Sequence, residues 1–228
     1  MSVNATWACG AAFCKRYPTA EAARLARARC TAARNGGAPT PAVWQGAKAD
    51  VLCFDRIESH GAASLKEMVA ALTVLHLVPM PGLGRFDPFS RIRPRLEAAP
   101  PSVRALVDGL ANKDAALAWS AAGVVHGDFH PGQVIRDQSG KVWLIDLDDL
   151  ALAPTEADLG NLAGWIATQT PGPLAGAVAG ALAQVLSVAS WADPTLTAHF
   201  LDIALVRRAL KLQEKGNDWV VRQLSVRA

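Results

Sequence analysis

Apolar positions recur with helical spacing along most of the chain, so the hydrophobic pattern predicts a largely helical protein with a few strands. Helices are predicted over residues 20–33, 63–77, 103–121, 159–168, 174–189, 195–212 and 218–226. Shorter apolar runs bounded by turn residues predict strands over residues 7–17, 50–57, 122–125, 133–135 and 141–146. Because the strands fall near the start and in the middle while helices fill the rest, the pattern predicts an α+β fold.

The composition is typical of a folded enzyme in water, since 51% of the 228 residues are hydrophobic and 19% are charged. The net charge of +3 is too small to indicate a nucleic-acid partner. No apolar run reaches the roughly 18 uninterrupted residues of a membrane helix. The four cysteines show no C-x-x-C spacing and no histidine partner, so we expect reduced thiols in a cytoplasmic protein.

The densest group of candidate catalytic residues lies in residues 124–150, VVHGDFHPGQVIRDQSGKVWLIDLDDL. Asp128 lies in a loop broken by proline and glycine, and Gln133 leaves that loop beside it. Side chains alternate along the last apolar run, so we expect Asp146 and Asp148 to share one face with Leu144. Two carboxylates and an amide oxygen suit a hard cation such as Mg²⁺, which leaves Asp128 to take a hydroxyl proton.

Each of these residues by itself also has a structural explanation. Aspartates in turns commonly cap backbone groups, and a single histidine before glycine is often a hydrogen-bonded core residue. The string GDFH resembles a metallophosphatase motif, but the further motifs of a two-metal site are missing. A G-x-S-x-G nucleophile elbow is missing too, so neither hydrolytic chemistry is supported.

Three motifs in register resemble the aminoglycoside phosphotransferase and choline kinase family, distant relatives of the protein kinases. They are HGDFHPGQ at residues 126–133, LIDLDD at residues 144–149 and ADLGN at residues 157–161. The resemblance implies that Asp128 orients and deprotonates an acceptor hydroxyl, that Asp146 binds magnesium ions, and that Asp158 braces the catalytic loop. His126 is then a residue that packs within the loop.

One position departs from the family pattern, because Gln133 stands where the family usually has a metal-binding asparagine. Both side chains offer an amide oxygen, although glutamine has one more methylene and more rotamers to lose on binding. We therefore expect Gln133, Asp146 and Asp148 to be the metal ligands. His130 either contacts the transferred phosphoryl group as a catalytic residue or makes a structural hydrogen bond within the loop.

The N-terminal part resembles a shortened small lobe of the kinase fold. Its strand carries Lys15, which the resemblance assigns to the α and β phosphates of the nucleotide. The following helix has no glutamate at the turns where the family usually pairs one with this lysine. Glu21 is its one acidic residue, and it lies too early in the helix. A partner chain or a second copy in an oligomer is one way in which the shortened lobe would be completed.

The expected architecture is a protein-kinase-like, two-lobe α+β fold with a truncated small β lobe. We expect the small lobe and hinge to span residues 1–59, with residues 54–59 as the hinge that meets an adenine edge. The mainly helical lobe, with the catalytic loop and the metal-binding hairpin, is expected to span residues 60–228.

These features predict an ATP-dependent phosphotransferase that uses Mg²⁺ and a small-molecule hydroxyl acceptor, with Lys15 and Asp146 contacting the nucleotide. A kinase small lobe normally begins with two strands joined by a loop that covers the phosphates, whereas only about ten residues precede the Lys15 strand here. The lack of this cover predicts weak nucleotide binding, on the order of tens of micromolar to millimolar. The rival hypothesis is a catalytically weakened kinase-like protein that acts by binding a partner or ligand. Residues 190–228 hold four acids and six bases, so we expect a neutral or acidic acceptor rather than a polycationic aminoglycoside.

Overall fold

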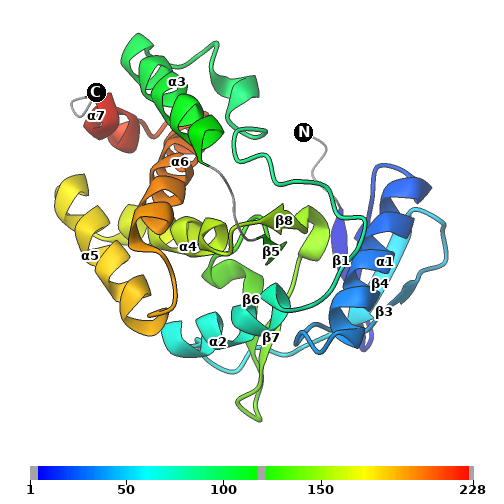
Figure 1. Cartoon of the computed structure of the whole chain (residues 1–228). Helices are drawn as coiled ribbons and strands as arrows, with labels where there is room; N and C mark the ends of the chain where they lie inside the picture. The colour runs from blue at the N-terminus through cyan, green and yellow to red at the C-terminus, as the bar shows by residue number, and fades with distance from the viewer. Residues whose placement is uncertain (1–4, 118–121, 226–228) are drawn as a thin grey trace. The chain divides into compact units, whose positions relative to one another are not determined.

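The computed structural model describes residues 5–117 and 122–225, and its chain folds into two compact units (Figure 1). Unit 1 comprises Met1–Gly84 and Pro131–Ala151, and unit 2 comprises Arg85–His130 and Leu152–Ala228. The chain therefore crosses from one unit to the other three times. The mixed α+β architecture agrees with the fold class expected from the hydrophobic pattern.

An antiparallel sheet with the strand order β1-β2-β4-β3 forms the N-terminal part of unit 1. Its strands are β1 (Thr6–Cys9), β2 (Ala12–Arg16), β3 (Val43–Gln45) and β4 (Val51–Asp55). The single strand predicted over residues 7–17 is therefore wrong. Gly10 adopts a φ of 59°, a left-handed conformation that glycine reaches without steric cost, and the resulting turn pairs Thr6 with Lys15.

Helix α1 (Ala20–Asn35) packs on this sheet and confirms the helix predicted there (Figure 1). The hydroxyl of Thr19 caps its first turn by accepting from the amide of Ala22 at 3.1 Å. Small alanines on the buried face, Ala23 and Ala26, pack in one cluster with residues of the sheet. Their short side chains let the helix backbone approach the strands closely.

The rest of unit 1 consists of helix α2 (Leu65–His76) and the hairpin of β6 (Val134–Arg136) and β7 (Val142–Leu144). The amide of His60 donates to the carbonyl of Arg136 at 2.7 Å, and α2 contacts β7. These contacts place α2 and the hairpin in one unit with the sheet. The partition thus differs from the expected division at residue 59, because contacts distant in sequence decide it.

Unit 2 is mainly helical. Its elements are η1 (Arg93–Arg95), α3 (Pro101–Ala116), β5 (Gly123–Val125), β8 (Ala151–Ala153), α4 (Glu156–Gln169), α5 (Leu174–Val188), α6 (Pro194–Gln213) and α7 (Trp219–Ser225), where β8 begins at the last residue of unit 1. The helices agree with the predicted ranges, although the predicted end of α3 at residues 118–121 lies outside the described residues.

Helices α4 and α6 form the most extensive helix pair of unit 2, and glycine makes the close approach possible (Figure 1). A Cβ atom on Gly160 would lie 2.6 Å from the backbone nitrogen of Leu201. One turn later, a Cβ atom on Gly164 would lie 3.0 Å from the Cβ of Ala204. The two glycines therefore set the distance between the helices that carry much of the candidate site of unit 2.

Two expectations from composition can be compared with the described residues. None of their helices is both long enough and apolar enough to cross a membrane. All four cysteines carry free thiols, with Cys9 exposed and the other three buried.

Candidate active site

The loop of unit 2 that carries Asp128 is held by a carboxylate at the start of helix α4. Asp158, whose side chain is buried, accepts hydrogen bonds from the amides of His126 at 2.7 Å and Gly127 at 3.0 Å. Gly127 has a φ of 80°, so the residue before Asp128 needs the freedom of glycine. The predicted bracing role of Asp158 is confirmed, and it fixes the backbone on which Asp128 sits.

Asn161 holds the other side of the same loop. Its Nδ2 donates to the carbonyl of Phe129 at 2.6 Å, while the ring of Phe129 is fully buried. Its Oδ1 accepts from Nη2 of Arg207 on α6 at 2.5 Å. The sequence analysis did not predict this role. The signal for it is a polar residue one turn after Asp158 on a buried helix face.

Two arginines hold the carboxylate of Asp128. Arg91 donates to Oδ2 at 2.9 Å and Arg207 donates to Oδ1 at 2.8 Å, and 21% of the Asp128 side chain remains exposed. Burial raises the pKa of Asp128. Arg207 and Arg91 lower it by more than burial raises it, so the pKa lies below its ordinary value. Asp128 is therefore ionised at neutral pH. Neither arginine was identified from the sequence.

His130 is neutral at physiological pH. Burial lowers its pKa to about 4, and the nearby cations Arg208 and Arg207 act in the same direction, while Asp128 opposes them. A neutral imidazole can donate one hydrogen bond and accept another. His126 is fully buried with its ring 5.8 Å from that of Phe129, in agreement with the packing role expected for it.

In unit 1 the predicted metal ligands are brought together by a turn rather than by a strand. Strand β7 ends at Leu144, Asp146 adopts a left-handed φ of 59°, and a 3-10 turn, η3 (Leu147–Asp149), follows. The expectation that strand alternation aligns Asp146 with Asp148 is therefore wrong. The buried side chains of Leu144 and Leu147 anchor the turn on either side.

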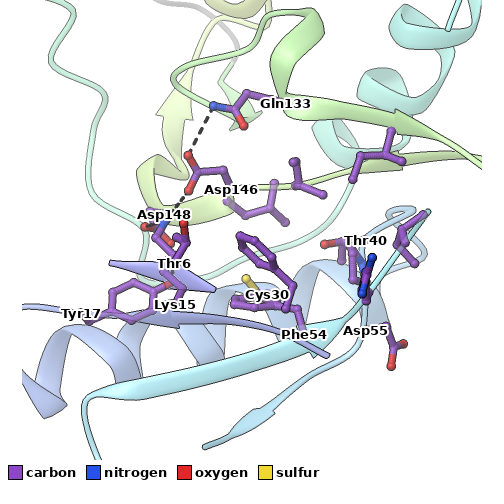
Figure 2. A pocket seen from close by; sticks show the side chains of 17 residues that line it. Thr6, Lys15, Tyr17, Cys30, Thr40, Phe54, Asp55, Gln133, Asp146 and Asp148 are labelled. Carbon is purple, nitrogen blue, oxygen red and sulfur yellow. Dashed lines mark hydrogen bonds and ion pairs between the residues drawn. The ribbon is translucent and has the colours of Figure 1, made fainter. Parts of the chain in front are cut away.

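Lys15 lies between these two carboxylates (Figure 2). It forms an ion pair with Asp146, and its Nζ lies 2.6 Å from Oδ2 of Asp148. Burial lowers the pKa of Lys15, but Asp148 and Asp146 outweigh burial and leave the pKa above its ordinary value. Nε2 of Gln133 donates to Oδ2 of Asp146 at 3.3 Å, so four of the predicted site residues gather in unit 1.

Further contacts fix Asp148 next to the lysine. The hydroxyl of Tyr17 donates to Oδ1 of Asp148 at 2.8 Å, and Arg29 on α1 donates to its backbone carbonyl at 2.6 Å. The face of α1 that is buried carries alanines and Cys30, and Glu21 pairs instead with Arg24 at 2.7 Å. Within the described residues, the carboxylates that pair with Lys15 thus come from the turn after β7 and not from the helix.

A cavity of about 350 Å³ in unit 1 borders this charged group. Its walls are mostly apolar and include Phe13, Phe54, Ile57, Ile135, Ile145 and Leu147. Figure 2 shows Lys15, Asp146 and Asp148 together on one side of the cavity and Thr40 and Asp55 on the other. The expected hinge begins at Phe54, and residues 54–57 line the cavity. An apolar cavity with charged groups at one side suits a ring system joined to an anionic chain.

The oxygen ligands of the turn fit a magnesium ion that is shared with a phosphate ligand. Mg²⁺ is usually bound through one or two carboxylates together with phosphates and water, which matches Asp146 and Asp148. Gln133 presents its amide nitrogen to Asp146 here, so its oxygen would reach a metal after rotation of the amide. Among residues 5–117 and 122–225, no group of three or more His, Cys, Asp or Glu forms a metal site made by protein alone.

Comparison with known proteins shows the family and the fold. The profile of a family described as Phosphotransferase enzyme family matches residues 4–193. Among curated proteins, none is matched by sequence.

Solved structures of similar fold include three kinases. Aminoglycoside phosphotransferase APH(3'')-Id from Streptomyces rimosus has a TM-score of 0.62 and 22% identity, and the match covers 86% of each chain. Choline kinase LicA from Streptococcus pneumoniae has a TM-score of 0.68 and 16% identity, over 98% of this chain and 90% of that one. Amicoumacin kinase hAmiN, in complex with AMP-PNP and Ca²⁺, has a TM-score of 0.70 and 12% identity, over 99% and 88%.

Proposed function

Because the chain belongs to the phosphotransferase enzyme family, we propose that it transfers the γ-phosphoryl group of ATP to a hydroxyl of a small molecule. The observation that carries this proposal is the group of Lys15, Asp146 and Asp148 at the edge of an apolar cavity. An adenine ring fits the apolar walls, while the charged group receives the phosphates and their metal.

Lys15 acts on the nucleotide in this proposal. Its ammonium group is held in place by Asp146 and Asp148. A phosphate chain entering the cavity offers oxygens to the lysine, which stays protonated because its pKa is raised. The hydrogen bond from Tyr17 keeps Asp148 in position while the partners of Lys15 change.

Asp146 and Asp148, together with the amide oxygen of Gln133, would hold magnesium. When bound, the metal supplies positive charge that neutralises the transferred phosphoryl group. The left-handed backbone at Asp146 and the following 3-10 turn direct both carboxylates to one place.

Asp128 acts on the acceptor. The acceptor oxygen forms a bond to the γ-phosphorus, the bond from that phosphorus to the bridging oxygen of ADP breaks, and the hydroxyl proton passes to the carboxylate of Asp128. Asp158 and Asn161 keep the loop rigid, so that little positional entropy has to be lost at this step. Neutral His130 is proposed to donate a hydrogen bond to the phosphoryl group.

One observation favours the rival role of a weakened, kinase-like binding protein. Each oxygen of the Asp128 carboxylate already accepts from an arginine, which lowers its affinity for a proton. The two roles differ in turnover. A binding protein would bind magnesium ATP without releasing ADP in the presence of any acceptor.

The test is release of ADP by the whole chain with magnesium ATP across neutral, anionic and cationic hydroxyl compounds. Asp128→Asn keeps the shape of the side chain but cannot take the proton, so turnover should fall by about 100-fold or more. Magnesium ATP should still stabilise this variant against heat, because residues of unit 1 bind the nucleotide. Turnover in Asp128→Asn equal to that of the native chain would overturn the assignment of Asp128.

A further inference from the structure

Four cations lie around Asp128 in unit 2. Arg91 and Arg207 contact its carboxylate directly, at 2.9 and 2.8 Å. Arg208 and Lys211 follow Arg207 on helix α6, and both are close enough to Asp128 that its charge raises their pKa. The single carboxylate therefore faces a surplus of positive charge.

Arg208 is the least satisfied member of this cluster. Its Nε is buried and has no hydrogen-bond partner in the described part of the chain, and its Nη2 reaches Oδ1 of Asn161 only at 3.5 Å. Burial and the neighbouring Arg207 lower the pKa of Arg208 to about 10, against the attraction of Asp128. A buried guanidinium with unused donors is costly unless an anion approaches it.

Lys211 is the solvent-exposed member of this cluster. Its residue is exposed, yet burial of the amine lowers its pKa, and Lys215, Arg207 and Arg208 act in the same direction. The attraction of Asp128 only partly offsets this. The exposed end of the cluster thus offers a cation that a ligand can reach from solvent.

Several acids of unit 2 do not balance this positive charge, because they form ion pairs with other residues. Glu214 lies 3.0 Å from Arg95, and Asp218 lies 3.1 Å from Arg222. Asp114 on α3 lies 3.2 Å from the ring of His199. These carboxylates are therefore committed to other partners than Arg208 and Lys211.

We propose that the acceptor carries an anionic group, a carboxylate or a phosphate ester, which Arg208 and Lys211 bind while the hydroxyl of the acceptor lies against Asp128. This inference rests on the proposed function, because it names the acceptor of that reaction. The anion would accept charge-assisted hydrogen bonds from Lys211 and from Arg208, whose contact with Asn161 is long at 3.5 Å. A polycationic acceptor would meet the like charges of four side chains, which disfavours an aminoglycoside.

Small vicinal diols that carry groups of different charge can test the inference with the whole chain. Glycerate and glycerol 3-phosphate carry an anionic group beside hydroxyls, 1,2-propanediol is neutral, and 3-amino-1,2-propanediol is cationic. Binding is measured by calorimetry without nucleotide, and ADP release is measured with magnesium ATP. We expect the anionic probes to bind at least about 10-fold more tightly than the neutral diol. The two anionic probes also show whether a carboxylate or a phosphate ester is preferred.

Variants locate the site. Arg208→Gln and Lys211→Gln should each weaken binding of the preferred anionic probe by about 10-fold and leave the neutral diol unaffected. The matched control is Arg222→Gln, which removes one positive charge from the same unit at a side chain that is 71% exposed. This control should bind the anion like the native chain. Because Lys211 is exposed, its variant is informative even if Arg208→Gln disturbs folding.

The outcomes separate this inference from the proposed function. Equal or tighter binding of the neutral or cationic probe, no binding of either anion, or unchanged anion binding in both variants would overturn the anionic acceptor. Anion binding that depends on Arg208 and Lys211, without ADP release from any acceptor, would instead overturn phosphotransfer and leave the anion site standing.

Discussion

At the scale of single residues, Asp146 combines charge with an unusual backbone. It is the one described residue other than glycine with a positive φ, at 59°. Such a conformation costs on the order of 1–3 kcal/mol in a residue with a side chain, and it persists where the surroundings enforce it. Asparagine and aspartate tolerate it better than most residues, because their short polar side chains bond locally.

Two substitutions of Asp146 should separate its charge from its backbone. Asp146→Asn removes the charge but keeps a residue that adopts left-handed backbone, whereas Asp146→Ala loses both features. We expect both variants to lose about 100-fold or more of the ADP release, because the negative charge for metal binding is gone. Asp146→Ala should also be less stable than Asp146→Asn by about 1 kcal/mol. Equilibrium unfolding in urea compares them, and equal stability of the two variants would contradict the argument.

His130 predicts a pH dependence of stability. Its pKa is about 4 in the folded chain and near the ordinary 6.5 in the unfolded chain, so the unfolded state binds more protons between these values. Stability from this residue is therefore present above pH 6.5 and is lost as the pH falls toward 4. His130→Gln cannot titrate, so its loss of stability between pH 7 and pH 5 should be smaller. Urea unfolding of both chains at the two pH values gives the comparison, and parallel losses would refute the assignment.

The sequence indicated the candidate site residues but not the residues that contact them. Asp128, Asp146 and Asp158 were recognisable because short motifs contain them, and Lys15 because its strand stands where the related family carries a lysine. Arg91 and Arg207 were not, because they meet Asp128 from 37 and 79 residues away and belong to no motif. Contacts between distant, ordinary surface-type residues leave no periodic signal.

At the scale of elements, the long periodic helices were predictable, whereas only some of the short strands were. Helix α1 was found from its spacing and from its Thr19 cap. The strands β3 and β8 span three residues each and were missed, whereas β5, β6 and β7 are equally short and were predicted from apolar runs bounded by turn residues. The alignment of Asp146 with Asp148 was expected for the wrong reason, because sequence alternation cannot show where β7 ends.

The close packing of α4 on α6 predicts different results for the same substitution at two helical glycines. Gly160→Ala would place a Cβ 2.6 Å from the backbone of α6, so the helices must separate, at a cost of about 1–3 kcal/mol. Gly180→Ala in α5 meets nothing within 4 Å and removes backbone freedom from the unfolded chain. That control should be neutral or more stable by up to about 1 kcal/mol. Thermal unfolding measures both, and a Gly160→Ala chain as stable as the control would contradict the packing argument.

At the scale of the whole molecule, the predicted site residues are distributed over both units. Asp128 and His130 belong to unit 2, whereas Gln133, Asp146 and Asp148 belong to unit 1 with Lys15. The boundary falls at Pro131, inside one motif. No local pattern marks it, because contacts such as the 2.6 Å bond from the amide of Leu144 to the carbonyl of Pro39 decide where the hairpin packs.

Because Lys15, Asp146 and Asp148 all belong to unit 1, we expect stabilisation of the molecule by nucleotide to depend on Lys15. A ligand that binds only the folded state at 100 times its Kd adds about 2.7 kcal/mol of stability, so magnesium ATP should raise the melting temperature of the native chain. In Lys15→Met the phosphates lose their cation, and we expect most of this rise to vanish. Arg16→Met is the matched control from the same strand, since Arg16 is exposed and lies 3.6 Å from Asp50. Because each shift is measured against the same variant without nucleotide, any direct effect of the substitution on folding cancels. A rise in Lys15→Met as large as that in Arg16→Met would show that the lysine does not contact the nucleotide.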